Sequence, residues 1–213
     1  MVELVCNSVS RMSSLSRTGY VVTSRVLHVG ARLRVGTLGK CGRGPLAVQE
    51  LQGTISMSTK FRLEPLPIEE FLPFFKLSDE ELHKRSAKWL VADRKPCYPC
   101  RVTLADAEVG ERVLAVPFIH HDVQSPYRAS GPVFVRETAQ TVNLAVNEIP
   151  IMFHHRLLSL RAYDLDGMMV DAKVIQGTEL EQAIVDHFEN CDVQYQHIHN
   201  ADPGCFDCAV RRV

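Results

Sequence analysis

The sequence predicts a single α+β domain, with a mostly antiparallel sheet of about six or seven strands and two or three short helices. Short strand-like segments follow one another with brief links, whereas a parallel doubly wound fold needs helices between most strands. The charge also changes sign along the chain. Residues 1–56 carry a net charge of +5, and residues 57–213 carry −6. We therefore expect the domain to span 57–213, after an N-terminal segment of another kind.

Short helices are predicted over residues 67–75, 79–86 and 179–189, with a helical turn that begins at Pro150. Pro67 suits the first turn of the first helix, and Pro73 keeps that helix short. Ser78 followed by Glu81 is a capping box for the second helix, and we expect Thr178 and Glu181 to do the same for the third.

Strands are predicted over residues 101–104, 112–120, 132–137, 157–163, 169–176, 193–199 and 205–213. The segment 169–176 alternates cleanly, with Val170, Ala172 and Val174 on one face. The turn 164–167 therefore joins 157–163 to 169–176 as a hairpin. No G-x-G-x-x-G or P-loop pattern is present, so a nucleotide-binding fold has no support.

The N-terminal segment 1–56 is basic and poor in acidic residues, and three interpretations stay open. It is a transit peptide, a disordered tail, or sequence upstream of a natural start at Met57. A transit peptide implies a mitochondrial or plastid matrix, and otherwise we expect a cytoplasmic protein. The arginines are dispersed, so no nucleic-acid partner is expected. No apolar run approaches the ~18 residues of a membrane-spanning helix, so no membrane association is expected. The oligomeric state stays unknown.

His197 and His199 are the first candidates for chemistry. Residues two apart in a strand share a face, so the two imidazoles would lie ~6–7 Å apart at Cα. Such a pair suits acid–base catalysis, an anion clamp or a metal. Hydrogen-bonded structural histidines are the alternative.

A polar loop after His120 and His121 is the second candidate, because its prolines and glycine restrict its shape. The candidate ligand-binding residues are Ser125, Tyr127, Arg128, Ser130, Arg136 and Asn200. Arginine and backbone donors suit a carboxylate or phosphate, so we expect a small anionic ligand. This hypothesis requires the loop to lie near the end of the strand that carries the two histidines. A plain surface loop with an Arg–Asp pair is the alternative.

A mixed nitrogen and sulfur site suited to zinc is a further hypothesis, with His197, His199, Cys205 and Cys100 as ligands. His120 could join this set. The chain has two C-x-x-C pairs, but we expect its cysteines to be thiols. A non-catalytic interaction domain is the remaining hypothesis, and it requires no shared geometry among the histidines.

Several long segments resemble the family called domain of unknown function 1203. They are Ser125-Pro-Tyr-Arg-Ala-Ser-Gly-Pro-Val-Phe-Val-Arg-Glu137, Leu157-Leu-Ser-Leu-Arg-Ala-Tyr163, Asp166-Gly-Met-Met-Val-Asp-Ala172 and His197-Ile-His-Asn-Ala-Asp-Pro-Gly-Cys205. The resemblance covers about residues 57–213 and supports Met57 as the older start. It implies shared positions and no assigned activity. We therefore expect an uncharacterised protein with a small-anion site, a hydrolase or transferase that uses histidine and arginine, or else a zinc-binding or interaction module.

Overall fold

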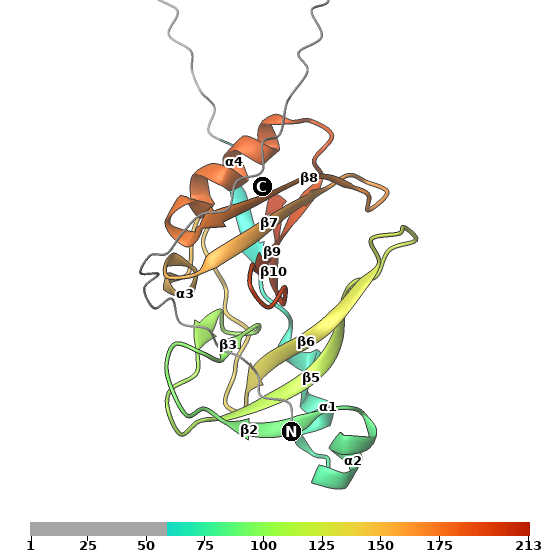
Figure 1. The fold of residues 1–213 in the computed structure, drawn as a ribbon, viewed down its shortest axis with the longest axis vertical. Helices are drawn as coiled ribbons and strands as arrows, with labels where there is room; N and C mark the ends of the chain where they lie inside the picture. Colours follow the sequence, from blue (N-terminus) through green and yellow to red (C-terminus); the bar gives the residue numbers. More distant parts are fainter. Residues whose placement is uncertain (1–58) are drawn as a thin grey trace, which may run out of the picture. The chain divides into compact units, whose positions relative to one another are not determined.

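The computed structural model describes residues 59–213, which form two five-stranded sheets and several short helices (Figure 1). In chain order the elements are β1 (Phe61–Glu64), η1 (Ile68–Glu70), α1 (Leu72–Phe75), α2 (Asp79–Lys84), β2 (Lys88–Val91), β3 (Pro99–Cys100), β4 (Ala105–Asp106), β5 (Arg112–His121), β6 (Ala129–Arg136), α3 (Ile151–His154), β7 (Leu157–Tyr163), β8 (Met169–Gln176), η2 (Gly177–Glu179), α4 (Leu180–Glu189), β9 (Tyr195–Asn200) and β10 (Phe206–Arg212). The predictions for residues 1–56 lie outside the described part.

The predicted α+β class with mostly antiparallel strands is confirmed. The strands form two sheets, in the orders β1-β10-β9-β7-β8 (sheet A) and β2-β5-β6-β3-β4 (sheet B). The pairing of β3 with β6 is parallel, and it rests on one residue pair, Cys100 with Phe134. No helix in residues 59–213 is long and apolar enough to cross a membrane.

Two local predictions are wrong. Residues 101–104 form a turn and not a strand, because Arg101 turns inward to a buried ion pair and Leu104 has a φ of +45°. The expected capping box of Thr178 with Glu181 is replaced by one of Gln176 with Glu179 at the start of η2. There the Glu179 carboxylate accepts from the Gln176 N–H at 3.1 Å.

Sheet A buries one of its faces under α3 and α4. Along β7 the alternation sends Leu158, Leu160 and Ala162 into this core, where they meet Ile184 and Phe188 of α4. Burial of each large apolar side chain contributes roughly 1.5–3 kcal/mol. The intervening residues of β7 therefore lie on the opposite face of sheet A.

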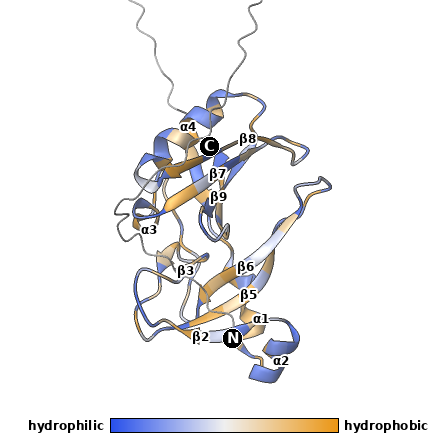
Figure 2. Cartoon of the chain, in the orientation of Figure 1, coloured by the Kyte–Doolittle hydropathy of each residue, from blue (hydrophilic) through white to orange (hydrophobic). Residues whose placement is uncertain are grey.

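Sheet B builds a second core against α1 and α2, with Leu114 and Val133 from its central strands and Leu82 from α2. Leu82 is the one buried residue of α2, and Figure 2 shows the hydrophilic colouring of that helix. Phe206 of β10 also belongs to this core. Sheet A therefore contributes a ring to the core of sheet B, and the two sheets meet beside that ring.

The loop between β5 and β6 packs against the turn between β7 and β8. The Ser125 hydroxyl donates to the carbonyl of Gly167 at 2.8 Å, and the Cα of Gly167 faces the side chain of Val123. Gly167 has a φ of +75°, and Asp164 accepts two backbone hydrogen bonds within the turn. The predicted hairpin is thus confirmed, and its turn helps to hold the two sheets together.

Candidate functional site

One face of sheet A carries a polar patch on two neighbouring strands. The antiparallel register of β7 and β9 pairs Ser159 with His199, Arg161 with His197, and Tyr163 with Tyr195. Directly opposite residues of such a pair have Cα atoms ~4.5–5.5 Å apart, so these six side chains adjoin. We call these six residues the Arg161 face. It includes both histidines that the sequence predicts as functional.

Two further histidines reach this face from sheet B. The pairing of β5 with β6 has a bulge between Ile119 and His121, which breaks the alternation of side chains. Consecutive residues His120 and His121 therefore both contact sheet A. The ring centre of His120 lies 5.2 Å from that of His199, and the ring centre of His121 lies 4.9 Å from that of His197. The sequence hypothesis required the segment after His120 to lie near the strand of His197 and His199, and the two segments meet at these four histidines.

Phe206 forms the apolar side of this cluster. Its ring stacks on His120 at 4.8 Å with an interplanar angle of 11°. Its centre also lies 5.0 Å from the ring of His197 and 5.6 Å from the ring of His199. A phenyl ring offers no hydrogen bond and excludes water, so it increases the cost of charging these imidazoles.

The four histidines differ in their hydrogen bonds. His121 is satisfied at both nitrogens, with Nδ1 2.7 Å from the Tyr127 carbonyl and Nε2 2.8 Å from the Tyr195 hydroxyl. His199 has one bond, from Nδ1 to the Gly204 carbonyl at 3.0 Å. Three buried nitrogens have no partner in the described residues: His120 Nδ1, His197 Nδ1 and His199 Nε2. Buried polar atoms are nearly always paired, so three unpaired nitrogens in one cluster indicate a place for a polar ligand or water.

Burial and neighbouring bases lower the pKa of these histidines. The pKa of His120 falls to about 4, that of His197 to about 2 and that of His199 to about 3, with burial the largest cause in each. Arg161 lowers the pKa values of His120 and His199 further. The three imidazoles are therefore neutral near pH 7.

Arg161 differs from every other arginine that the structure shields from solvent. Residues 59–213 contain four arginines that are buried or half-buried. Arg101 pairs with Asp207, Arg136 with Glu111, and Arg156 with Asp106. Arg161 has no carboxylate partner within the described residues, and its guanidinium Nε donates to the Ser159 hydroxyl at 3.3 Å. Burial raises the pKa of the Tyr163 phenol, and Arg161 acts to lower it.

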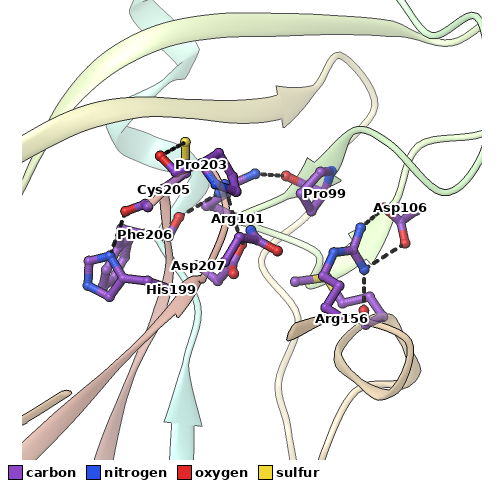
Figure 3. Close-up of polar contacts among 12 residues, drawn as sticks. Pro99, Arg101, Asp106, Arg156, His199, Pro203, Cys205, Phe206 and Asp207 are labelled. Carbon is purple, nitrogen blue, oxygen red and sulfur yellow. Dashed lines mark hydrogen bonds and ion pairs between the residues drawn. The ribbon is translucent and has the colours of Figure 1, made fainter. Parts of the chain in front are cut away.

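A buried ion-pair network adjoins Phe206 (Figure 3). The Arg101 guanidinium donates from Nε to the Phe206 carbonyl at 2.8 Å and lies 3.3 Å from the Asp207 carboxylate. Asn200 donates to the same carboxylate at 2.9 Å. Arg101 lies in the turn after β3 of sheet B, and Asp207 occupies the bulge of β10 in sheet A. This network therefore holds the two sheets together beside the site.

Most of the predicted ligand-binding residues have structural partners instead. Arg128 pairs with Asp122 at 2.8 Å, as the plain-loop alternative expected, and Ser125 donates to a backbone carbonyl. Arg136 lies opposite Val113, eight residues along the hairpin from Arg128, roughly 25 Å away at ~3.3 Å per residue. The Asn200 amide is engaged by Asp207.

Tyr127 and Ser130 are also exposed residues of the same hairpin. The Tyr127 carbonyl hydrogen-bonds Nδ1 of His121, and the ring centre of Tyr127 lies 6.4 Å from that of Tyr163. Ser130 is exposed on β6 opposite Ile119. Of the predicted loop residues, Tyr127 is thus the one with a direct contact to the histidine cluster.

The cysteines proposed as zinc ligands are free thiols. The sulfur of Cys100 accepts the Arg136 N–H at 3.4 Å, and burial raises the pKa values of Cys205 and Cys208. In residues 59–213, no group of three or more His, Cys, Asp or Glu side chains is arranged to hold a metal ion. The zinc hypothesis therefore stays a prediction from the sequence.

Sequence reasoning missed Ser159, Arg161 and Tyr163. Their signal was present, because residues 157–163 alternate apolar and polar side chains in the same way as the histidine strand. The sequence marked His121 as the start of a loop, and His120 as the start of that loop and a further candidate zinc ligand. The bulge that turns both side chains toward sheet A cannot be recognised from the two-residue alternation of a strand sequence.

A surface depression of about 280 Å³ lies by the turn between β7 and β8. Its lining is Asp164, Leu165, Asp166, Val170, Cys191, Asp192 and Gln194. Three aspartates make it unsuited to an anion, so it does not compete with the Arg161 face as an anion site.

A family model described as "Protein of unknown function (DUF1203)" matches residues 97–212, more than half of the 213-residue chain. The match includes β5, β7, β9 and β10, and so every strand that contributes to the Arg161 face and the histidine cluster. No curated protein and no solved structure matches the chain.

Proposed function

The chain belongs to the DUF1203 family, and we propose that its Arg161 face binds a small oxyanion such as a phosphate or a carboxylate. The observation that carries this proposal is the missing partner of Arg161. Every other shielded arginine of residues 59–213 meets an acidic side chain. A ligand that supplies the missing negative charge gives Arg161 the same kind of partner.

The energetics favour an anion at this position. A half-buried guanidinium without a counter-charge loses hydration and gains no ion pair, which destabilises the ligand-free protein. An oxyanion would form charge-assisted hydrogen bonds with it, each worth roughly 1.5–3 kcal/mol. The planar guanidinium can also bind two oxygens at once, which gives the site a preferred ligand geometry.

The surrounding donors suit an oxyanion as well. Ser159 and Tyr163 contribute hydroxyl groups two residues before and after Arg161, and the ring centre of His197, which has an unpartnered Nδ1, lies 5.0 Å from that of Tyr163. Burial and neighbouring bases are the causes that lower the pKa values of His120, His197 and His199, so the surroundings of the site favour a negative charge. We therefore propose Arg161 as the anion-binding arginine, in place of Arg128 and Arg136, which the sequence suggested.

Binding is better supported than acid–base catalysis in the ligand-free protein. A general base works best when its pKa lies near the working pH. The pKa values of His197 and His199, about 2 and about 3, lie far below neutrality. Hydrolysis or group transfer would require the ligand itself to raise these values.

The test is calorimetric titration of the full chain with inorganic phosphate and with acetate. We expect saturable binding of at least one of them, weakened roughly 30- to 150-fold by Arg161→Met, since about 2–3 kcal/mol converts to that factor. Arg85→Met makes the same chemical change at an exposed arginine after α2 and should bind as the wild type does.

Arg128→Met separates this proposal from the loop hypothesis. Loss of binding in Arg128→Met with retention in Arg161→Met would move the ligand to the loop between β5 and β6. Absence of binding by the wild-type chain would overturn the proposal.

A further inference from the structure

We propose that His199 takes up a proton at Nε2 when an oxyanion binds to the Arg161 face, so that binding is coupled to proton uptake. This inference rests on the proposed function and specifies how the same site is regulated. It assigns the proton to one nitrogen of one residue, among four histidines in contact.

The hydrogen bond at Nδ1 determines the tautomer of His199. The Gly204 carbonyl can only accept, and it lies 3.0 Å from Nδ1, so Nδ1 carries the hydrogen. In the neutral ring Nε2 then carries a lone pair and no hydrogen. That atom is buried without a partner, and His199 is 1% exposed.

The ring of His199 belongs to the Arg161 face, where the ligand is proposed to bind, and Arg161 acts on its pKa. His199 is the cross-strand partner of Ser159, and the Arg161 guanidinium donates to the Ser159 hydroxyl. A lone pair repels an oxyanion at this position, whereas an N–H⁺ group attracts it and donates to it. Addition of one proton therefore converts an unfavourable contact into a charge-assisted hydrogen bond.

The other histidines differ from His199 in their hydrogen bonds. His121 is already bonded at both nitrogens and needs no change. His197 has an unpartnered Nδ1, and no backbone hydrogen bond acts on its pKa, so its ring can present a neutral N–H to the ligand through its tautomer. His120 also has an unpartnered Nδ1, and the backbone of Phe118 raises its pKa. His199 differs from His120 in its place on the Arg161 face and in its Nδ1, which lies 3.0 Å from the Gly204 carbonyl.

The charged and titratable groups that face His199 are bases on every neighbouring element: His120 of β5, Arg161 of β7, His197 of β9 and Arg101 of the turn after β3. Asp207 lies nearby; its Oδ1 is held by Arg101 and Asn200, whereas its Oδ2 is buried without a hydrogen-bond partner. The ligand is thus the one new negative charge that His199 would meet. An opposite charge within ~4–6 Å favours the protonated form, by roughly 1–3 in pKa for each unit charge.

The experiment is titration of the full chain with sodium sulfate in pairs of buffers that differ in ionisation enthalpy, at several pH values from 5.5 to 7.5. Sulfate stays unprotonated over this range, so any proton taken up must reside on the protein. We expect uptake that approaches one proton per bound sulfate at the acidic end. We also expect affinity to rise by up to about tenfold for each unit of pH decrease.

His199→Gln supplies the matched control, because a glutamine amide can donate to the anion without a proton. This variant should still bind sulfate, with an affinity independent of pH and no proton uptake. Imidazole ¹⁵N NMR of the wild type gives the same answer without a variant, since Nε2 of His199 should change from a bare to a protonated nitrogen when sulfate is added.

The outcomes separate this inference from the proposed function. Sulfate binding without proton uptake would overturn the role of His199 and leave anion binding in place. Uptake that persists in His199→Gln would assign the proton to another residue and also overturn it. Absence of binding of both sulfate and phosphate would overturn the proposed function and this inference together.

Discussion

Replacement of Arg101 with methionine should destabilise the protein strongly, whereas the same replacement at Arg161 should leave the ligand-free stability nearly unchanged. The side chain of Arg101 is 2% exposed, and its guanidinium lies 3.3 Å from the carboxylate of Asp207, which is 0% exposed. Its removal leaves a buried, uncompensated carboxylate. Loss of one partner of such a pair costs about 3–5 kcal/mol.

Removal of Arg161 leaves no partner charge behind. The variant loses the hydrogen bond to the Ser159 hydroxyl at 3.3 Å, worth about 1 kcal/mol, and the methionine keeps much of the apolar contact. Relief of an unpaired, half-buried guanidinium acts in the opposite direction. We expect the two terms to cancel within about 1 kcal/mol, so the variants should differ in unfolding free energy by at least about 2 kcal/mol.

Urea denaturation followed by tryptophan fluorescence measures this difference. The chain has one tryptophan, Trp89 of β2, which packs on Phe75 at 5.3 Å and so reports on the core of sheet B. With m-values of roughly 1–3 kcal/mol/M, the two variants should unfold about 1 M urea apart. A ligand at 100 times its Kd should add about 2.7 kcal/mol to the wild type and far less to Arg161→Met. Equal destabilisation by the two substitutions would refute the reasoning, because Arg161 would then be a structural residue like Arg101.

Three further predictions concern stability. The free energy of unfolding should fall by at least about 2 kcal/mol from pH 7 to pH 5: the unfolded chain binds protons below pH ~6.5 at three histidines that stay neutral when folded, each contributing about 1.4 kcal/mol per pH unit. Urea unfolding at both pH values checks this, and His197→Gln should reduce the dependence; a flat profile would contradict the neutral cluster. Gly177→Ala should cost more than about 3 kcal/mol in thermal or urea unfolding, because its Cβ would lie 1.7 Å from a backbone carbonyl oxygen, while Gly131→Ala, with 3.9 Å to the nearest atom, should fold normally. Asp207→Asn should lose about 3–5 kcal/mol by leaving Arg101 without its counter-charge, and wild-type stability in this variant would show that the pair is dispensable.

The part of the site that follows a strand period was predictable from the sequence. The two-residue period correctly placed His197 and His199 on one face of β9. The same rule applied to β7 selects Ser159 and Arg161 as the polar face of a strand whose other face is apolar. The local patterns therefore contained most of the Arg161 face, although each strand had to be considered separately.

The rest of the site depends on contacts between distant segments. The division of the strands into two sheets follows from pairings such as β1 with β10, which local patterns do not specify. Burial of Arg101 depends on Asp207, 106 positions away in the chain, and a charged residue alone predicts exposure. The inward turn of both His120 and His121 depends on a bulge in the pairing of β5 with β6. Each feature is specified by tertiary structure and not by periodicity.

The most direct test of anion binding is side-chain NMR of the arginine Nε–H groups during titration with phosphate. Residues 59–213 hold four shielded arginines, and three of these have carboxylate partners. We predict that the Arg161 resonance shifts in proportion to site occupancy, while those of Arg101 and Arg156 stay in place. A titration that leaves Arg161 unchanged, or that shifts only exposed arginines such as Arg128, would contradict the proposed site.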